Sequence, residues 1–505
     1  MRAIKPTAMH SRLLLAVAVA SLAAASVGLT GSQESRAAGS VTITIQLQPG
    51  TGAPDAPTNK VLQTLTRAYE SRHPGVTVTY QPNSFTDISQ SNARLVALAA
   101  AHSAPDVVWE QYGEVTGGSV PQGILQNLLP YLQRPNPYVR GNKHWIDLWQ
   151  SVTIPYMRSA NGGIYILLGS DVDVAIFYNK ADFARAGIRS KPNTWQDWVA
   201  DMAKLKSHGI TPYMFADGGI CNPSWYEREF SSELLHNDLS RFDVDHQQVA
   251  TGLDTAVGIT RGIISMRNPA YAEGWKLLAS LRKYLAPGAS TFDACSQVNA
   301  PSPPLSPIPP FVQGRFSMIW GGTWYFHDLK ASGFAGKYGI FPFPTITTAT
   351  TRYSSNIDVR GVIGGPNGSG QWSVTSQQAD ASMTPAKTRQ VMDFLAYLYA
   401  PQNEGRWVAN MSNGTFIPLV KGAVAPKIPG LSSIIPNGLP PKTVEGILDG
   451  GLTAKATHDG LRLLQSYLSG DTSWSSFSTQ WDALLVQAAN GWARQNHVDL
   501  SKYRR

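Results

Sequence analysis

Two aspartates, Asp171 and Asp173, stand two positions apart beside apolar and β-branched residues. Ionised carboxylates offer only hydrogen-bond acceptors, so this pair suits a ligand that is rich in hydroxyl groups. The runs on either side, residues 164–168 and 174–178, predict strands, and the pair itself predicts a turn between them. One of the two carboxylates can instead cap the adjacent turn or helix, and the sequence leaves both interpretations open.

Aromatic side chains are the second source of binding chemistry. The 505 residues include 14 Trp and 19 Tyr, and the C–H faces of sugars pack well on aromatic rings. The candidates follow a predicted third strand or lie in two later aromatic stretches: Trp109, Glu110, Gln111, Tyr112, Trp225, Tyr226, Trp320 and Trp324. Core packing is the alternative for each of these rings, and a surface turn is the alternative for Glu110.

Patterns typical of catalysis are weak. Glu227 and Glu229 are two residues apart, which places them on opposite sides of a strand or about 200° apart on a helix, so they are not expected to share a site. No Gly-x-Ser-x-Gly occurs, and the ten His show no ligand spacing. Gly365 and Gly370 have the spacing of a phosphate-binding loop, but Gln371 replaces the required Lys. We therefore expect no enzymatic activity, no metal and no cofactor.

Only two cysteines occur, Cys221 and Cys295. In an exported protein such a pair favours a disulfide, worth about 4 kcal/mol at this loop length in the chain-entropy model. Two unpaired buried thiols are the alternative.

The first residues predict an export signal. Arg2, Lys5 and Arg12 precede an apolar, Ala-rich run over residues 13–29, and residues 35–37 offer a cleavage site. An uncleaved membrane anchor is the alternative, because the run approaches the length of a membrane span. Since the first cysteine is Cys221, an N-terminal lipid is not expected. The predicted location is periplasmic or extracellular.

The elements that must position the candidate residues point to an α/β fold. A chain of 505 residues with 43% hydrophobic content predicts two or three globular domains. Residues 41–48, 58–70 and 76–80 alternate as strand, helix and strand, which starts a parallel sheet covered by helices. Ligands of open α/β sheets bind outside the carboxyl ends of the strands, where residues 109–112 lie. The net charge of +8 is modest for this length, so nucleic acid is not an expected partner.

Later segments have distinct signals. Thr194 and Asp197 form a capping box at the start of a helix with an apolar stripe. Residues 220–230 appear irregular, and the prolines of residues 301–310 predict an extended surface loop with no evident role. Residues 474–488 predict an amphipathic terminal helix.

Several motifs occur in an order that resembles the bacterial extracellular solute-binding proteins of sugar ABC importers, the maltose-binding type. They are Tyr178-Asn179-Lys180, the Pro192-Asn193-Thr194-Trp195 helix start, the residues 104–108 (APDVV), Gly314 with Met318, Gly322 and Trp324, and Pro401 followed by Trp407. The resemblance covers nearly the whole chain after residue 37. It implies a type II periplasmic-binding-protein fold with two lobes, each a mainly parallel sheet flanked by helices, and three crossings between them.

The resemblance also implies boundaries and a function. We expect a signal peptide at 1–37, lobe 1 at 38–170 and 319–363, and lobe 2 at 171–318 and 364–505. Gly322, at a helix start, and Gly364, at the third crossing, join the expected ligand-binding residues. The expected partners of this monomer are a saccharide, delivered by hinge closure, and the permease subunits of an ABC importer.

Three alternatives stay open. The family also binds polyols and glycerol phosphates, and Arg360, just before the third crossing, is the residue that suits a phosphate. A secreted glycan hydrolase would need a suitably separated carboxylate pair. A metal- or phosphate-binding receptor would need ligand spacings that this chain lacks.

Overall fold

The first lobe is built around a four-stranded sheet in the order β2-β1-β3-β9. Strand β1 (Val41–Gln46) pairs in parallel with β2 (Val76–Gln81) and β3 (Val107–Val108), and β9 (Ser373–Val374) adds an antiparallel edge. A computed structural model describes residues 40–48, 59–83, 88–109, 119–120, 122–296, 298, 300–369, 371–410, 416–436, 438–449 and 451–504. The chain divides into Met1–Gly39 and Ser40–Arg505, and everything below concerns the second unit.

Helices cover this sheet as the β-α-β prediction requires. In α1 (Lys60–Glu70), Leu62, Leu65 and Tyr69 recur at helical spacing and are buried in the core. The other elements that contribute to the same core are α2 (Ile88–Ala100), α4 (Leu129–Leu132), η3 (Trp145–Leu148), α5 (Ile154–Met157), α13 (Pro385–Leu398) and α14 (Pro401–Val408).

The second lobe surrounds the carboxyl half of the long strand β4 (Ser170–Asn179). This half pairs antiparallel with β6 (Met318–Gly322) and β7 (Tyr338–Phe341), and β5 (Tyr213–Met214) joins β6 in parallel. The sheet is therefore mixed rather than mainly parallel. Nine helices of the described chain belong to this lobe: α6 (Lys180–Arg185), α7 (Trp195–Ser207), α8 (Cys221–Leu234), α9 (Gly252–Thr260), α10 (Pro269–Ser280), α11 (Ile308–Val312), α12 (Tyr325–Ala331), α15 (Ala454–Ser469) and α16 (Trp474–Gln495). Short 3₁₀ turns complete it at η4 (His236–Arg241), η5 (Arg282–Tyr284), η6 (Ala289–Thr291), η8 (Leu431–Ser433) and η9 (Leu500–Tyr503).

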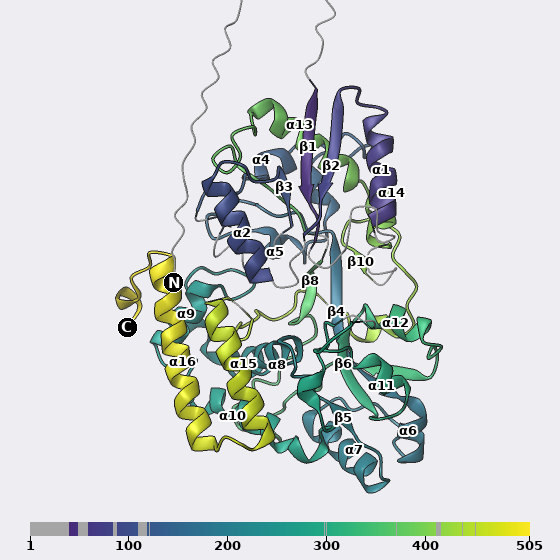
Figure 1. The fold of residues 1–505 in the computed structure, drawn as a ribbon, viewed down its shortest axis with the longest axis vertical. Coiled ribbons are helices and arrows are strands. Elements are labelled where there is room, and N and C mark those ends of the chain that lie inside the picture. Colours follow the sequence, from purple (N-terminus) through teal and green to yellow (C-terminus); the bar gives the residue numbers. More distant parts are fainter. Residues whose placement is uncertain are drawn as a thin grey trace, which may run out of the picture. The chain divides into compact units, whose positions relative to one another are not determined.

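Strand β4 is the first of three crossings between the two lobes (Figure 1). Val172 packs in the first core, whereas Ile176 packs in the second. The chain returns between Ile363 and Trp372, through β8 (Gly364–Ser369), and crosses again between Val420 and Leu431, after β10 (Ile417–Pro418). Strands β8 and β10 both pair with the first half of β4, so all three crossings meet there.

The predicted boundaries at 318/319 and 363/364 need correction. Residues 319–363 stay in the second lobe, because β6 and β7 pair with β4 and Trp320, Ile340 and Phe341 pack in its cores. At residue 364 the chain enters the first lobe instead of leaving it, and it returns only after β10. Three crossings are present, but the one expected at 318/319 is absent, and the one after β10 was not predicted.

Some local predictions were right and two were wrong. The predicted proline-rich surface loop of residues 301–310 ends in the helix α11, where Ile308 and Pro310 are buried. The capping box at the start of α7 is present in both directions, and α16 buries Phe477, Trp481 and Leu485 as expected. Residues 221–234, however, form the regular helix α8 instead of an irregular stretch, with Pro223 in its first turn, where proline is tolerated. Among the described residues, no helix is long and apolar enough to cross a membrane.

Candidate functional site

Asp171 and Asp173 lie on the first half of β4, where the three crossings meet. They belong to a continuous strand and not to the predicted turn, because Asp171 pairs with Ile417 of β10 and Asp173 pairs with Gly364 of β8. Residues two apart on a strand point to the same face, so the two carboxylates face the same side. Both are buried, with exposed fractions of 8% and 1%.

Three of the four carboxylate oxygens lack hydrogen-bond donors. One oxygen of Asp171 and both oxygens of Asp173 are buried and accept no hydrogen bond from the described chain. Burial raises the pKa of Asp171 and of Asp173, and the neighbouring charge of Asp171 raises the pKa of Asp173 further. An unpaired buried acceptor costs about 1–3 kcal/mol. A ligand with hydroxyl donors would remove that cost.

Trp324 directly follows Thr323, a residue whose backbone is hydrogen-bonded to Asp173. The backbone N–H of Thr323 donates to the carbonyl of Asp173 at 2.9 Å, which ties the start of α12 to β4. The ring of Trp324 packs over Gly322, since a Cβ there would stand 2.0 Å from a ring carbon. Trp324 is half-buried and contacts all three hydrophobic clusters of the two lobes, so its ring lies at their junction.

Gly364 is required by the backbone at the same place. Its φ is +80°, and a Cβ would stand 1.7 Å from the carbonyl oxygen of Val172. No other residue type fits without moving one of the strands. The structure thus brings together four predicted residues around Thr323: Asp171, Asp173, Gly322 and Gly364, with Trp324 as the adjacent ring.

Tyr156 on α5 is a site residue that the sequence did not reveal. Burial raises the pKa of its phenol, and the charges of Asp171 and Asp173 raise that pKa further. A side-chain hydrogen bond from Gln248 of the second lobe acts in the opposite direction. The sequence predicts only a loop around Tyr156, and a lone Tyr in a loop gives no signal.

Two predicted ligand-stacking rings are core residues instead. Tyr226 is 1% exposed and donates its hydroxyl proton to the carbonyl of Gly274 at 2.8 Å, facing α10. Trp320 is 0% exposed, and Phe343 lies 4.8 Å from its ring centre. Neither ring has a free face for a ligand, so both predictions are wrong.

Trp225 is buried in the second core, but its ring also contacts Trp324. It is 8% exposed, and its ring lies edge-on to Trp324 with centroids 6.0 Å apart. This contact makes Trp225 a support for the Trp324 ring and links α8 to the junction.

Trp109 ends the β3 region in the first core. It is 5% exposed, and its indole N–H makes no hydrogen bond to the described chain. Glu110, Gln111 and Tyr112 lie outside the described residues.

Arg360 is already paired. Its guanidinium donates to both carboxylate oxygens of Asp358, with Nε at 2.8 and 3.0 Å, and this bond raises the pKa of Arg360 and lowers that of Asp358. The positive charge that was expected to attract a phosphate is therefore matched by an adjacent carboxylate.

Glu227 and Glu229 do not share a site, as expected from their spacing. Glu227 accepts from the Tyr271 hydroxyl at 2.7 Å and from the N–H of Leu448 at 3.0 Å. Burial raises the pKa of Glu227 to about 7. Burial and the charge of Glu233 raise the pKa of Glu229, so the two carboxylates have different surroundings.

The disulfide prediction is confirmed. Cys221 and Cys295 are bonded, with their Cα atoms 6.1 Å apart, and the bond ties the first residue of α8 to the segment after η6.

Two groups of potential metal ligands occur among the described residues, and both are otherwise engaged. Cys221 and Cys295, beside Asp293, form the disulfide. In the group of Asp243, Asp245 and Asp254, the ammonium of Lys442 lies 2.5 Å from Asp243 and 3.2 Å from Asp254, and Asp245 accepts a hydrogen bond from the Thr251 hydroxyl.

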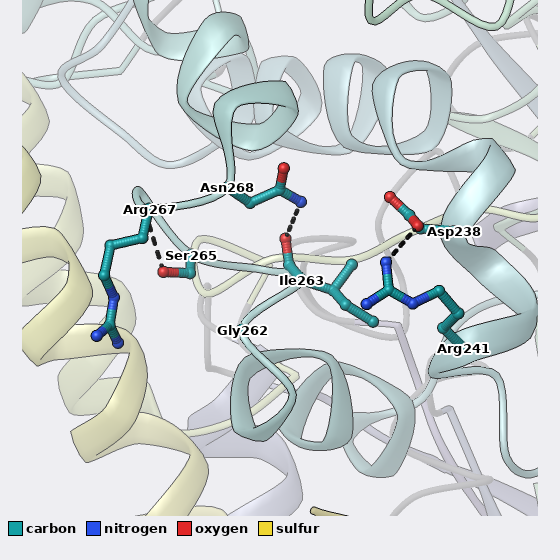
Figure 2. A pocket seen from close by; sticks show the side chains of 7 residues that line it. All are labelled: Asp238, Arg241, Gly262, Ile263, Ser265, Arg267 and Asn268. Atoms are coloured by element: carbon teal, nitrogen blue, oxygen red, sulfur yellow. Dashed lines mark hydrogen bonds and ion pairs between the residues drawn. The ribbon is translucent and has the colours of Figure 1, made fainter. Parts of the chain in front are cut away.

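A cavity of about 280 Å³ lies between η4 and the loop before α10 (Figure 2). Its polar groups satisfy one another: Arg241 pairs with Asp238 at 2.6 Å, and the side-chain amide of Asn268 donates to the carbonyl of Ile263 at 2.7 Å. None of the predicted site residues lines it.

Comparisons with known proteins agree with the resemblance. Residues 52–234 match the family model described as bacterial extracellular solute-binding protein. No curated protein matches this chain.

Solved structures of similar fold include a chitin oligosaccharide binding protein, with 19% sequence identity and a TM-score of 0.62 over 90% of this chain and 100% of that chain. The solute-binding protein RafE in complex with raffinose has 16% identity and a TM-score of 0.58 over 89% of this chain and 100% of that chain. The GacH receptor of Streptomyces glaucescens, solved unliganded and with acarbose, has 17% identity and a TM-score of 0.56 over 90% of this chain and 99% of that chain.

At these identities the solved structures establish the fold, and the family match rests on residues 52–234. The fold expected from the resemblance is confirmed: residues 52–234 match the model of the bacterial extracellular solute-binding proteins, and the chain has a two-lobed α/β fold similar to these solved structures.

Proposed function

We propose that this protein captures a neutral carbohydrate, an oligosaccharide, between its two lobes and delivers it to an ABC importer. The observation that carries the proposal is the pair of buried carboxylates on β4, three of whose oxygens accept no hydrogen bond from the described chain, at the junction of the two lobes, where the Trp324 ring also packs. Sugar hydroxyls supply the missing donors, and the indole face packs on sugar C–H groups. The similar solved structures include proteins named for binding chitin oligosaccharide, raffinose and acarbose.

A phosphorylated ligand is the less favoured alternative. Asp171 and Asp173 would repel a phosphate when ionised, and Arg360 is already bonded to Asp358. A polyol remains compatible with the same carboxylates, because it offers the same hydroxyl donors.

A glycan hydrolase is disfavoured by geometry. Glycosidases place two carboxyl groups on either side of the scissile bond. Asp171 and Asp173 belong to one strand and face the same side, so they would contact a ligand from the same direction. We infer that the protein binds its ligand without hydrolysing it.

The remaining parts of the proposal follow from the family. The chain is exported to the periplasm or the cell surface after loss of residues 1–37 and is not lipid-anchored at its N-terminus. It acts as a monomer and does not bind nucleic acid. Its macromolecular partners are the permease subunits of the importer.

Thermal melting of the purified protein against a ligand panel tests the proposal. The panel contains neutral mono- and oligosaccharides, polyols and glycerol 3-phosphate, each monitored for turnover. At 100 times its dissociation constant, a ligand stabilises the folded state by about 2.7 kcal/mol. We expect a clear shift with one class of oligosaccharide and no product. Shifts only with phosphorylated compounds, or hydrolysis of the sugar, would contradict the proposal.

A further inference from the structure

A second cavity, of about 620 Å³, lies in the second lobe away from Asp171 and Asp173. Tyr178 and Lys180, at the carboxyl end of β4, form part of its wall. Seven residues of extended strand separate Tyr178 from Asp171, which corresponds to roughly 20 Å along β4. The volume is in the range of about 300–1,000 Å³ that is usual for small-molecule sites.

Four lysines from four separate segments line this cavity. Lys180 starts α6, Lys191 lies between α6 and α7, Lys330 is in α12, and Lys427 is in the crossing that follows β10. The described lining contains no Asp or Glu, and none of the four ammonium groups forms an ion pair with a described carboxylate. Lys180 donates to the carbonyl of Gly336 at 3.1 Å. Like charges gathered without a counter-charge favour an anion.

The floor of the cavity is apolar. Phe326 and Ile340 are buried, and the ring of Tyr338 is half-buried beside them. The nearest carboxylate on α12, Asp328, does not belong to the lining and is close to His327, whose charge lowers the Asp328 pKa against the effect of burial. The cavity thus combines a hydrophobic surface with a basic rim.

The last wall is the third crossing between the lobes. Residues 426–430 line the cavity, and this segment connects Val420 of the first core to Leu431 of the second lobe. The site is therefore assembled from the carboxyl end of β4, α12, β7 and a connecting segment, and none of its lining residues belongs to the carbohydrate site.

We propose that this cavity is a second ligand site, which binds a small organic anion with an aromatic or aliphatic body and a phosphate, phosphonate or carboxylate group. The anion contacts the lysine ammonium groups, and its body packs on Phe326, Tyr338 and Ile340. Neutral sugars are not its expected ligands, because its lining offers no carboxylate to accept from sugar hydroxyl groups, whereas its four ammonium groups suit an anion.

Titration calorimetry at low ionic strength tests this site with three probes: phenylphosphonate, inorganic phosphate and benzyl alcohol. We expect phenylphosphonate to bind at least tenfold more tightly than either of the others, and its affinity to fall as salt is added. The double variant K330Q/K427Q should weaken phenylphosphonate binding at least tenfold, and K191Q should weaken it less.

Matched controls separate the site from general charge effects. Lys60 and Lys143 are exposed lysines of the first lobe, so K60Q/K143Q should bind phenylphosphonate as the unchanged protein does. Asp173→Asn should also leave this binding unchanged, whatever it does to sugar binding. Melting curves confirm that each variant is folded.

Three results would overturn the proposal. The first is that the unchanged protein does not bind phenylphosphonate. The second is that K330Q/K427Q binds phenylphosphonate as tightly as the unchanged protein does. The third is that the unchanged protein binds benzyl alcohol as tightly as phenylphosphonate. Binding of an oligoglutamate peptide that requires these lysines, with no binding of phenylphosphonate, would overturn it in favour of an acidic polypeptide partner.

Discussion

At the scale of single residues, the proposed carbohydrate site depends on two carboxylates that the folded chain buries while leaving three of their oxygens without donors. Asp171 and Asp173 keep this arrangement because β4 is held on both edges, by β8 and β10, and cannot turn its side chains away. Buried carboxylates with raised pKa values and no internal donors are typical of sites where a ligand supplies the missing hydrogen bonds. The consequence can be measured as a dependence of stability on pH.

The first prediction concerns this pH dependence. Burial raises the pKa of Asp171 to about 7 and raises that of Asp173 as well. Between the ordinary Asp pKa of about 3.9 and the raised value, the folded state holds more protons than the unfolded state. The free energy of unfolding of the ligand-free protein therefore falls as pH rises through this window, and it levels off above it.

Asp173→Asn should flatten this decline and stabilise the ligand-free protein by about 1–3 kcal/mol at pH 7.5, because it removes an unpaired buried charge. Denaturant unfolding at pH 4.5, 6 and 7.5 measures the effect. The exposed Asp471→Asn serves as control and should follow the unchanged protein. Parallel curves for Asp173→Asn and the unchanged protein would show that Asp173 is not held protonated.

The second prediction concerns Gly364. Gly364→Ala adds a Cβ 1.7 Å from the carbonyl oxygen of Val172 at a φ of +80°, so both a clash and backbone strain result. We expect a loss of about 3 kcal/mol in the free energy of unfolding. Gly470→Ala is a matched control, since its φ is +94° but nothing lies within 4 Å of its Cβ, and it should cost about 1 kcal/mol. Equal losses would mean that the β8 and β4 strands move apart freely.

At the scale of elements, α8 shows why part of the fold escaped prediction. Nearly every residue from Asn222 to Leu234 is buried, so the helix has no polar face and no 3.6-residue pattern. In contrast, α1 and α7 lie at the surface, and their buried stripes and the Thr194–Asp197 capping box were visible in the sequence. The same loss of pattern hid the core positions of Tyr226 and Trp320.

The crossings were recognised more readily than their directions. Asp171 and Gly364 mark two of them, because carboxylates and a glycine pair interrupt strand-like runs. Whether a strand such as β6 packs in one lobe or the other depends on its pairing with β4, over 140 residues away in the sequence. No local sequence pattern reports such a pairing. The disulfide was predictable because only two cysteines exist.

The third prediction concerns that disulfide. The bond closes a loop of 74 residues, because it joins Cys221 at the start of α8 to Cys295. The double variant C221S/C295S should lose about 4 kcal/mol of unfolding free energy in the chain-entropy model. Denaturant unfolding with and without dithiothreitol measures this. Reductant should lower the stability of the unchanged protein and leave the variant unaffected. A variant as stable as the oxidised protein would show that the bond contributes nothing.

At the scale of the whole molecule, three crossings meet at one place, and the proposed carbohydrate site lies there. Groups from both lobes contribute to it: Tyr156 from the first lobe, and Trp324 and Gln248 from the second. Hinge closure around a ligand changes the contacts of such a junction more than those of either core. The cavity with four lysines lies at the other end of β4, so the two sites can be tested independently.

The measurement that tests the account most directly is titration calorimetry of the oligosaccharide found by melting, with Asp173→Asn and Trp324→Ala. Loss of a hydrogen bond to a charged group costs about 1.5–3 kcal/mol, so Asp173→Asn should weaken binding roughly 10- to 150-fold, and Trp324→Ala should weaken it at least tenfold. The controls are Asp217→Asn, a buried aspartate in the second lobe, and Trp474→Ala, a half-buried tryptophan of α16. Both should bind as the unchanged protein does. Unchanged affinity in Asp173→Asn and Trp324→Ala would contradict a carbohydrate site at the junction of the crossings.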